Sequence, residues 1–344
     1  KNEVAEFIYK RTYSRWIEKE NRREDWPETI ERFIGFITEE RPDIPEKTQN
    51  KIRKYMMKFA VMPSMRFLWA AGPAAKADNT TIYNCSFAKM NTVDAFAECL
   101  YVLMCGTGFG FSVEKEEIEK LPEIPVIKSG QPLPKVRIED SKAGWADSVK
   151  TLMNSLYDGQ NIYFNYDEIR LEGARLKTMG GRASGPAPLI KLHDFLRETM
   201  HGAQGRKLTP LEAHDICNQI AEIVVVGGVR RSSQISLSDL DDEEMRHAKD
   251  WPYPIKRAMA NNSAIYREKP TAAEFLQEWG SLAQSGTGER GIFNLEAAQS
   301  KAPSRRYAPL IQGTNPCGEI MLRDMEFCNL SEVVVRPEDD LDSL

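Results

Sequence analysis

The segment Thr314-Asn315-Pro316-Cys317-Gly318-Glu319-Ile320 carries the strongest signal in the chain. Proline fixes φ and glycine accepts φ values that other residues avoid, so we expect Cys317 at the tip of a turn. Asn315 and Glu319 stand two residues to either side, and side chains at i and i+2 share a face in extended backbone. A thiol, a carboxylate and an amide therefore converge on one small volume, which indicates a site for chemistry.

Two other cysteines are candidates for the same site. Cys328 follows in Phe327-Cys328-Asn329-Leu330 and can face the site if Cys317 caps a loop and Cys328 lies on the outgoing strand. Cys85 lies on an expected strand far upstream, where an inward-facing core residue is an equal interpretation. A disulfide between Cys85 and Cys328 needs Cα atoms about 5.5–6 Å apart, which the sequence alone does not decide. The remaining thiols fall on apolar helix faces, and we expect them in the core: Cys99, Cys105 and Cys217.

The composition is that of a soluble globular protein. Of the 344 residues, 41% are hydrophobic and 28% are charged, and the net charge of −5 gives no whole-molecule attraction to nucleic acid or to anionic membranes. No apolar run approaches the length of a membrane span. Six scattered cysteines do not form a secreted disulfide scaffold or a zinc site, so we expect a cytoplasmic protein without a bound metal.

The rest of the chain predicts an α/β fold. Short β-like runs alternate with amphipathic helices after Pro63, a pattern typical of mostly parallel strands. The expected strands are Thr81–Phe87, Phe109–Val113, Gln234–Leu237, Ser263–Tyr266, Gly291–Asn294 and Leu330–Val335. The expected helices are Val93–Cys105, Ala143–Tyr157, Leu189–His201, Pro210–Val226 and Thr271–Ser285.

Two segments differ from this alternation. The first 60 or so residues look helical and charged, with a helix starting at Trp26-Pro27-Glu28-Thr29 and an apolar stripe that follows: Ile30, Phe33, Ile34 and Ile37. A second helix is expected from about 47 to 60. The segment Lys115–Glu139 is rich in Pro, Lys and Glu, and we expect it to be a surface excursion.

Glycine-bearing loops are candidates for contact with phosphates. Gly106-Thr107-Gly108-Phe109-Gly110 matches no phosphate-binding motif and by itself indicates a tight turn. Gly180-Gly181-Arg182-Ala183-Ser184-Gly185-Pro186 allows close backbone approach, and Lys177 and Arg182 could meet an anion. A flexible surface loop is an equal interpretation of this second segment.

Together these residues resemble the ribonucleotide reductase large subunit. Within that superfamily the chain is most similar to the adenosylcobalamin-dependent (class II), monomeric ribonucleoside-triphosphate reductases. The resemblance spans almost the whole chain, and the segments that carry it are Tyr9–Trp16, Pro63–Trp69, Asn84-Cys85, Gly108–Val113, Glu168–Pro186, Asp215–Asn218, Val229–Ser232, Asn261–Ser263, Gly291–Leu295 and Gly313–Ile320.

The resemblance implies a thiyl-radical reaction that reduces ribonucleotides to 2′-deoxyribonucleotides. Cys317 would lie on a finger loop (about 312–328) inside a ten-stranded α/β barrel and would become the radical that takes the ribose 3′-hydrogen. The 5′-deoxyadenosyl radical of adenosylcobalamin would generate it. Glu319 would be the general base and Asn315 would bind the ribose. Cys85 and Cys328 would supply protons and two electrons and would end as a disulfide.

The resemblance also implies further sites and partners. Near the substrate, a ribonucleoside triphosphate, would lie Pro63, Ser64, Asn84, Gly108 and Gly110. A deoxynucleoside triphosphate effector would bind in the region of about 140–190, at a specificity loop with Lys177, Gly180, Gly181, Arg182 and Ser184. A thioredoxin or similar dithiol would be the reductant. The expected domains are an N-terminal helical region, 1–62, and the first half of the barrel, 63–344.

Length is the main departure from this family, whose members continue well past the second redox cysteine. We therefore expect that a second half-barrel is missing, that a second chain could supply it, and that the isolated chain is inactive. Two alternatives stay open. One is a class I-type large subunit whose radical comes from a separate metallo-subunit, and the other is a non-catalytic nucleotide-binding half that needs no thiol chemistry.

Overall fold

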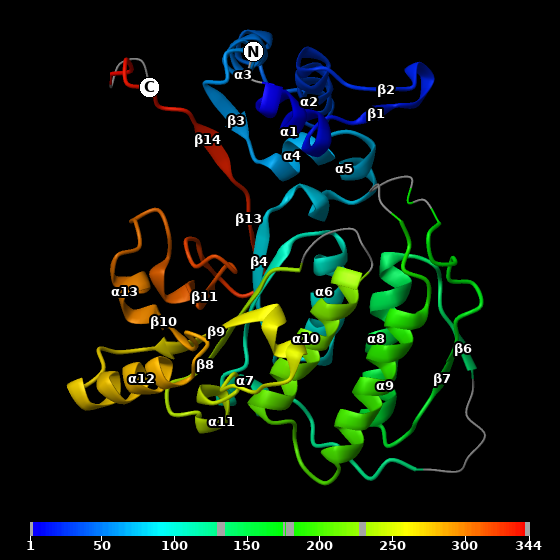
Figure 1. Cartoon of the computed structure of the whole chain (residues 1–344), viewed down its shortest axis with the longest axis vertical. Helices are drawn as coiled ribbons and strands as arrows, with labels where there is room; N and C mark the ends of the chain where they lie inside the picture. Colours follow the sequence, from blue (N-terminus) through cyan, green and yellow to red (C-terminus); the bar gives the residue numbers. More distant parts are fainter. Residues whose placement is uncertain (1–2, 129–134, 175, 177–181, 227–231, 341–344) are drawn as a thin grey trace. The chain divides into compact units, whose positions relative to one another are not determined.

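The computed structural model describes residues 3–128, 135–174, 176, 182–226 and 232–340. The chain divides into two compact units (Figure 1). The first comprises the residues up to Asn84 together with those from Asn329 onward, and the second comprises Cys85–Cys328. The predicted domain boundary after residue 62 stays a prediction. No helix in the described part is long and apolar enough to cross a membrane.

The first unit is mainly helical, as the sequence predicts. Its elements are α1 Glu3–Thr12, β1 Trp16–Ile17, η1 Glu18–Glu20, β2 Arg22–Arg23, α2 Trp26–Glu40, α3 Glu46–Met57, β3 Val61–Pro63, α4 Met65–Ala70, α5 Pro73–Ala77, η2 Asn79–Ile82 and β14 Ser331–Val333. Strand β14 pairs antiparallel with β3, so the end of the described chain returns to this unit.

Helix α2 begins where the sequence signal places it. Asp25 is the N-cap and forms a capping box with Glu28, because each side chain accepts a hydrogen bond from the other residue's backbone N–H. Of the predicted apolar stripe, Ile30, Phe33 and Ile34 are buried and Ile37 is half-buried. The periodicity therefore reports the buried face of this helix correctly.

The second unit is built on a six-stranded sheet in the order β10-β9-β8-β5-β4-β13. The five strands from β4 to β10 are parallel, and β13 joins the β4 edge in the antiparallel direction. The strands of this sheet are β4 Cys85–Lys89, β5 Gly108–Ser112, β8 Gln234–Asp239, β9 Ala260–Tyr266, β10 Gly291–Asn294 and β13 Glu326–Cys328. The predicted α/β class is confirmed. In the described part the sheet is open, so the closed ten-stranded barrel stays a prediction.

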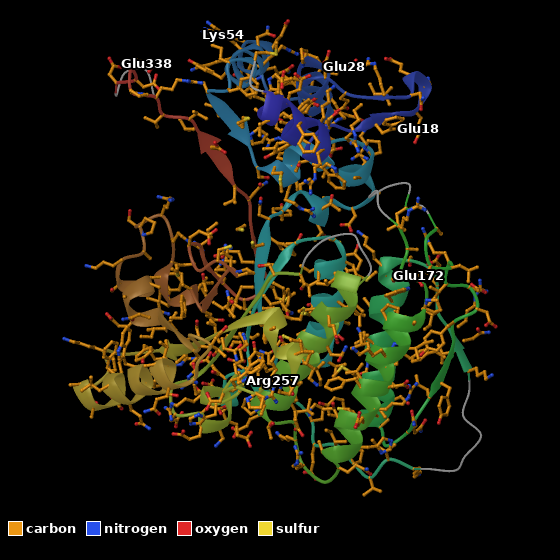
Figure 2. The ribbon with its side chains drawn as sticks, viewed as in Figure 1. Glu18, Glu28, Lys54, Glu172, Arg257 and Glu338 are labelled. Carbon is orange, nitrogen blue, oxygen red and sulfur yellow. The ribbon has the colours of Figure 1, made fainter. Side chains whose placement is uncertain are left out.

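The remaining elements of this unit are mostly helices. They are α6 Val93–Met104, α7 Lys115–Ile118, β6 Lys135–Arg137, α8 Lys142–Tyr157, β7 Tyr163–Asn165, α9 Ala187–Gly202, α10 Pro210–Val226, α11 Glu243–Arg246, η3 Ile255–Met259, α12 Ala272–Gln284, α13 Leu295–Ser300, η4 Ala308–Leu310, β11 Gly313–Thr314 and β12 Met321–Leu322. Helices α6, α8, α9 and α10 pack against one another (Figure 1). Arg257 of η3, labelled in Figure 2, donates two hydrogen bonds to Asp215 on α10, at 2.8 and 2.9 Å.

The two faces of the sheet bury different sets of side chains. On β5, Phe109 and Phe111 belong to the large core formed with α6, α8, α9 and α10. The neighbouring Phe87 and Ile235 belong to a second apolar cluster, which includes Leu322 of β12. Because side chains alternate along a strand, Gly108 and Gly110 face this second side. The finger-loop segment therefore packs on the face of the sheet opposite the helices.

Two local predictions were wrong. The segment predicted to be a surface excursion buries four apolar side chains in the large core: Ile118, Leu121, Ile124 and Ile127. Its Pro, Lys and Glu residues dominate the composition, while its evenly spaced apolar residues anchor it. The strand predicted from Thr81 begins only at Cys85, because Asn79–Ile82 forms a 3-10 turn capped by the Asp78 side chain.

Candidate active site

Cys85 and Cys328 face each other across two strands. They are direct register partners in the antiparallel pair β4–β13, and both are free thiols, with Cys85 half-buried and Cys328 buried. Directly opposite residues in such pairs have Cα atoms roughly 4.5–5.5 Å apart, which falls within the range that a disulfide spans. The backbone therefore holds the two cysteines where they can form a disulfide without rearrangement.

Cys317 lies at the tip of a closed loop, as predicted. The short strands β11 and β12 pair antiparallel, and Asn315 closes the loop between them through two hydrogen bonds with Ile320. Its backbone N–H donates to the Ile320 carbonyl at 3.1 Å, and its side-chain Oδ1 accepts from the Ile320 N–H at 3.0 Å. Gly318 takes a left-handed φ of +83°. Cys317 and Glu319 are consequently exposed.

Glycines let this loop lie directly on the sheet. A Cβ atom on Gly110 would stand 2.1 Å from the Thr314 carbonyl oxygen, and one on Gly313 would stand 2.1 Å from the Phe87 ring. A Cβ on Gly108 would meet the Cys85 sulfur and the Pro316 ring, both at 3.1 Å. The sequence assigned Gly108 and Gly110 to the substrate. In the structure both are required for the close packing of the finger loop, and a substrate contact stays a prediction.

The three thiols and Glu319 influence one another electrostatically. The Cys85 and Cys328 thiols interact directly, which raises the pKa of Cys85 and lowers the pKa of Cys328. Partial burial is the main cause that raises the pKa of Cys317, and the Glu319 carboxylate and the nearby Cys85 raise it further. The Glu319 carboxylate also acts on Cys85 and Cys328. All four groups therefore belong to one site.

Asn315 has a second function available besides closing the loop. The residue is fully buried, and its Nδ2 has no hydrogen-bond partner among the described residues. The amide lies near the Cys85 sulfur and lowers the pKa of that thiol, although the contact lacks the geometry of a full hydrogen bond. An unsatisfied buried donor costs about 1–3 kcal/mol, so a partner for it would be stabilising.

The other predicted substrate residues lie in the first unit. Pro63, Ser64 and Asn84 line a cavity of about 1080 Å³. The Ser64 hydroxyl caps α4 by accepting a hydrogen bond from the Phe67 N–H at 3.0 Å. Sequence reasoning missed the aromatic side chains that also line this cavity, Tyr9, Trp26 and Phe59, of which the last two are stacked at 4.8 Å. The apolar spacing of α1 and α2 gave no signal for a cavity.

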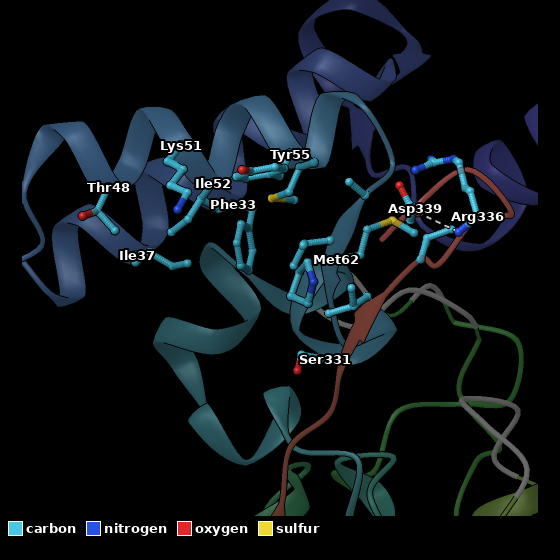
Figure 3. Close-up of a pocket in the computed structure, with 16 residues that line it drawn as sticks. Phe33, Ile37, Thr48, Lys51, Ile52, Tyr55, Met62, Ser331, Arg336 and Asp339 are labelled. Carbon is cyan, nitrogen blue, oxygen red and sulfur yellow. Dashed lines mark hydrogen bonds between the residues drawn. The ribbon is translucent and has the colours of Figure 1, made fainter. Parts of the chain in front are cut away.

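A smaller cavity of about 500 Å³ lies in the same unit, lined by α2, α3, β3 and β14 (Figure 3). Phe33, Ile52 and Tyr55 contribute apolar surface, and Arg336 and Asp339 stand at one end, where the Arg336 N–H donates to the Asp339 carboxylate at 2.7 Å. No residue predicted for the site except Pro63 lines it. It therefore adds nothing to the thiol chemistry.

The predicted specificity loop is described only at its ends. Lys177, Gly180 and Gly181 lie outside the described residues. Arg182 is exposed and donates to the Gly173 carbonyl at 2.9 Å, and Ser184 donates to the Gly185 carbonyl at 3.3 Å. Backbone hydrogen bonds join Gly173 and Ala174 to Ala183, so the two ends of the segment lie together. An effector contact for these residues stays a prediction.

Neither a metal centre nor a second catalytic cluster emerges from the described ranges. They contain no group of three or more His, Cys, Asp or Glu side chains that could hold a metal ion. The other cysteines, Cys99, Cys105 and Cys217, are fully buried, which confirms their predicted place in the core.

Several known proteins are similar to this chain. The family model described as ribonucleotide reductase alpha domain matches residues 1–73. The adenosylcobalamin-dependent ribonucleoside-triphosphate reductase of Lactobacillus helveticus is 29% identical over 96% of this chain, and the match covers 54% of that protein. The enzyme of the same name from Euglena gracilis is 28% identical over 96% of this chain and 48% of its own length. This chain thus spans about half the length of these curated relatives.

Solved structures of ribonucleotide reductases share the fold of this chain. A crystal structure of B-12 dependent (class II) ribonucleotide reductase superposes with a TM-score of 0.81 at 25% identity, covering 95% of this chain and 55% of that one. The class Id ribonucleotide reductase alpha subunit of Actinobacillus ureae superposes with a TM-score of 0.53 at 13% identity, which shows a shared fold only. The chain is thus similar to adenosylcobalamin-dependent ribonucleotide reductases over almost its whole length.

Proposed function

We propose that this chain carries the thiol chemistry of an adenosylcobalamin-dependent ribonucleotide reductase, which converts ribonucleoside triphosphates into 2′-deoxyribonucleotides. One observation supports this above all. The finger-loop residues Cys317, Glu319 and Asn315 lie beside the facing pair Cys85 and Cys328, although Cys85 stands far upstream of the others in the sequence. The names of the curated relatives favour adenosylcobalamin over a separate metallo-subunit as the radical source.

The exposed position of Cys317 fits a radical source that approaches from outside the described residues. When bound, adenosylcobalamin would supply the radical that removes the hydrogen atom from the Cys317 thiol. The Cys317 thiyl would then take the ribose 3′-hydrogen atom while Glu319 accepts the proton of the 3′-hydroxyl. The unsatisfied Nδ2 of Asn315 would donate to a ribose oxygen.

Cys85 and Cys328 would complete the reduction. Protonation of the 2′-hydroxyl by this pair would release water from C2′, and the two thiols would give up two hydrogens in total and become a disulfide. The 3′-hydrogen would finally return from Cys317, which is again a thiyl for the next step.

The finer partners belong to the same proposal. A deoxynucleoside triphosphate effector would bind near the segment that holds Arg182 and Ser184, and a thioredoxin-like dithiol would reduce the Cys85–Cys328 disulfide. We also propose a cytoplasmic location, because the reaction needs reduced thiols.

The test is a turnover assay with adenosylcobalamin, a ribonucleoside triphosphate and a dithiol, in the presence of a polypeptide equivalent to the remaining part of a relative. We expect deoxynucleotide formation that is abolished by Cys317→Ser and unaffected by Cys217→Ser, a buried thiol outside the site. Nucleotide binding without turnover, equal in the wild-type chain and in Cys317→Ser, would instead identify a non-catalytic binding half. Formation of the thiyl with a metallo-subunit rather than with adenosylcobalamin would favour the class I-type alternative.

A further inference from the structure

The finger loop is not part of the six-stranded sheet. Its strands β11 and β12 form a separate two-stranded hairpin, so no sheet hydrogen bond ties the Cys317 loop to the Cys85–Cys328 pair. Proximity of Cys317 to that pair therefore comes from the packing of the loop on the sheet and from side-chain contacts. Packing of Gly313 on the Phe87 ring supplies one such contact on the sheet side.

Arg306 supplies a second contact from a segment that sequence reasoning did not single out. Its Nη1 donates to the Met321 carbonyl on β12 at 2.6 Å, and its Nη2 donates to the Glu326 carboxylate on β13 at 2.9 Å. The two side chains are 29% and 21% exposed, so water screens the ion pair only in part. One guanidinium thus joins the return strand of the finger loop to the strand that carries Cys328.

Together these contacts connect the finger loop, β4 and β13 in a closed ring of interactions. Met321 pairs with Thr314 at the base of the finger loop, beside Gly313, which lies on Phe87. Phe87 is the register partner of Glu326, which returns to Arg306. Only one residue, Phe327, separates Glu326 from Cys328 along β13. This ring of interactions therefore fixes the finger loop relative to β13, the strand that carries Cys328.

A neighbouring arginine provides a natural comparison. Arg323 also contacts Glu326, through its backbone N–H at 2.8 Å and its Nε at 3.1 Å, but its side chain is 54% exposed. It lies three residues from Glu326 and therefore closes only a local turn. Arg306 lies 20 residues from Glu326 and connects separate segments.

We propose that Arg306 is a positioning residue that, through Glu326 and the Met321 carbonyl, sets the distance between Cys317 and the Cys85–Cys328 pair. The inference rests on the proposed function only for the role of the three thiols. Within that reaction, the hydrogen abstraction at Cys317 and the reduction by Cys85 and Cys328 act on adjacent carbons of one ribose, so their separation must be held constant. Arg306 would influence the reaction without touching substrate.

The experiment measures positions rather than turnover. The full chain is treated with a short ethane-bridged bismethanethiosulfonate, and peptide mass spectrometry quantifies the linkage of Cys317 to Cys85 or Cys328. We expect Arg306→Gln to slow this linkage by about threefold or more, since losing charge-assisted hydrogen bonds of this kind typically changes equilibria by that much or more. Arg306→Lys should restore part of the linkage rate. Glu326→Gln should also slow the linkage, because it removes the carboxylate partner of Arg306.

Two comparisons separate positioning from general loosening. Formation of the Cys85–Cys328 disulfide within the sheet should stay at the wild-type rate in Arg306→Gln, and Arg323→Gln should leave both rates unchanged. The proposal is overturned if Arg306→Gln links Cys317 as fast as the wild-type chain, if Arg323→Gln slows the linkage equally, or if disulfide formation falls in parallel. Failure of the proposed function would appear differently, as nucleotide binding without turnover that is equal in the wild-type chain and in Cys317→Ser.

Discussion

Cys328 lies directly opposite Cys85, because the antiparallel strand β13 joins the edge of an otherwise parallel sheet at β4. A parallel neighbour would have needed a long crossover connection to reach the same place. Here the chain passes through the finger loop and returns immediately along β13. The antiparallel direction of β13 is therefore what pairs the Cys85 and Cys328 thiols near Cys317.

This register predicts a disulfide that forms without strain. Mild oxidation of the chain should remove two titratable thiols, and peptide mapping should join Cys85 to Cys328. Oxidation should not lower the free energy of unfolding, because the two strands already hold the sulfurs together. Thiol titration followed by proteolytic mapping measures the outcome.

Cys99→Ser is the matched control for this oxidation. The residue is fully buried in the core and outside the site, so the variant should still lose two thiols on oxidation. Predominant linkage of Cys317 to either strand cysteine would contradict the prediction, because it would show that the finger loop reaches the pair more readily than the strands reach each other.

The finger loop packs closely on β5, which predicts that position 110 tolerates no side chain in place of Gly110. In Gly110→Ala, the new methyl group would stand 2.1 Å from the Thr314 carbonyl oxygen, so either the loop or β5 must shift. Overpacking of this kind costs roughly 1–3 kcal/mol. We expect a lower free energy of unfolding in urea and a faster alkylation of Cys317, as the loop lifts from the sheet.

Gly280→Ala provides the comparison. Gly280 lies within α12, and no atom would come within 4 Å of an added Cβ. Alanine is favoured over glycine by about 1 kcal/mol in a helix interior, so this variant should be as stable as the wild-type chain or more stable. Equal stability of Gly110→Ala and Gly280→Ala would show that the packing of the finger loop does not require glycine at position 110.

Local sequence signals predicted most elements of the fold. Helix α10 and strand β10 have the predicted bounds, because apolar periodicity and flanking Gly or Pro report on nearby residues. The turn around Cys317 was likewise predicted from Pro316 and Gly318. The pairing of Cys85 with Cys328 needed the family resemblance, since no local signal encodes which strands become neighbours.

Long-range contacts explain what was missed. Phe109 and Phe111 alternate with glycines on β5, a pattern that shows one face packed by large side chains and one face kept empty. The sequence did not show what fills the empty face, which is the finger loop itself. Arg306 gave no signal either, because its partners Met321 and Glu326 lie 15 and 20 residues away and one of them is a backbone carbonyl.

A buried ion cluster predicts a strong dependence on one carboxylate. Glu278 accepts hydrogen bonds from Arg290 at 2.6 Å and from Arg246 at 2.9 Å, and all three side chains are at most 6% exposed. In Glu278→Gln, the buried Arg290 guanidinium would lose its ion-pair partner and Arg246 would keep only Glu243. Breaking such a buried cluster typically costs about 3–5 kcal/mol. Urea unfolding measures the loss.

An exposed ion pair serves as the control for that variant. Lys150 and Asp94 contact each other at 2.9 Å on the surface, with side chains 46% and 54% exposed. Lys150→Gln should leave the unfolding midpoint unchanged, because solvent screens such pairs. A shift in Lys150→Gln as large as that in Glu278→Gln would show that burial is not what makes the Glu278 cluster matter.

The Glu319 carboxylate predicts a change in the reactivity of Cys317. Burial is the larger cause that raises the pKa of this thiol, and the negative charge of Glu319 adds to it. In Glu319→Gln the charge disappears, so the pKa of Cys317 should fall and the thiolate fraction at neutral pH should rise. The pH dependence of iodoacetamide alkylation should move to lower pH. A shift to higher pH would mean that the carboxylate does not act on Cys317 as a nearby charge.

Stability should fall in acid because His193 is buried in its neutral form. Desolvation lowers the pKa of His193 from 6.5 to about 3, while its ring contacts Ser148 at 3.0 Å and Tyr166 at 2.7 Å. Since the folded pKa lies below the unfolded one, the stabilisation is complete above pH 6.5 and is lost as the pH falls toward 3. Each pH unit in that window should cost about 1.4 kcal/mol for this one group.

His193→Gln should remove this contribution from the acid limb. The variant loses some stability at pH 7 with the ring contacts, but its free energy of unfolding should decline less steeply between pH 6.5 and 4 than that of the wild-type chain. Urea unfolding at several pH values gives the slopes. Parallel curves for the wild-type chain and His193→Gln would show that His193 takes up its proton in the folded state as readily as in the unfolded state.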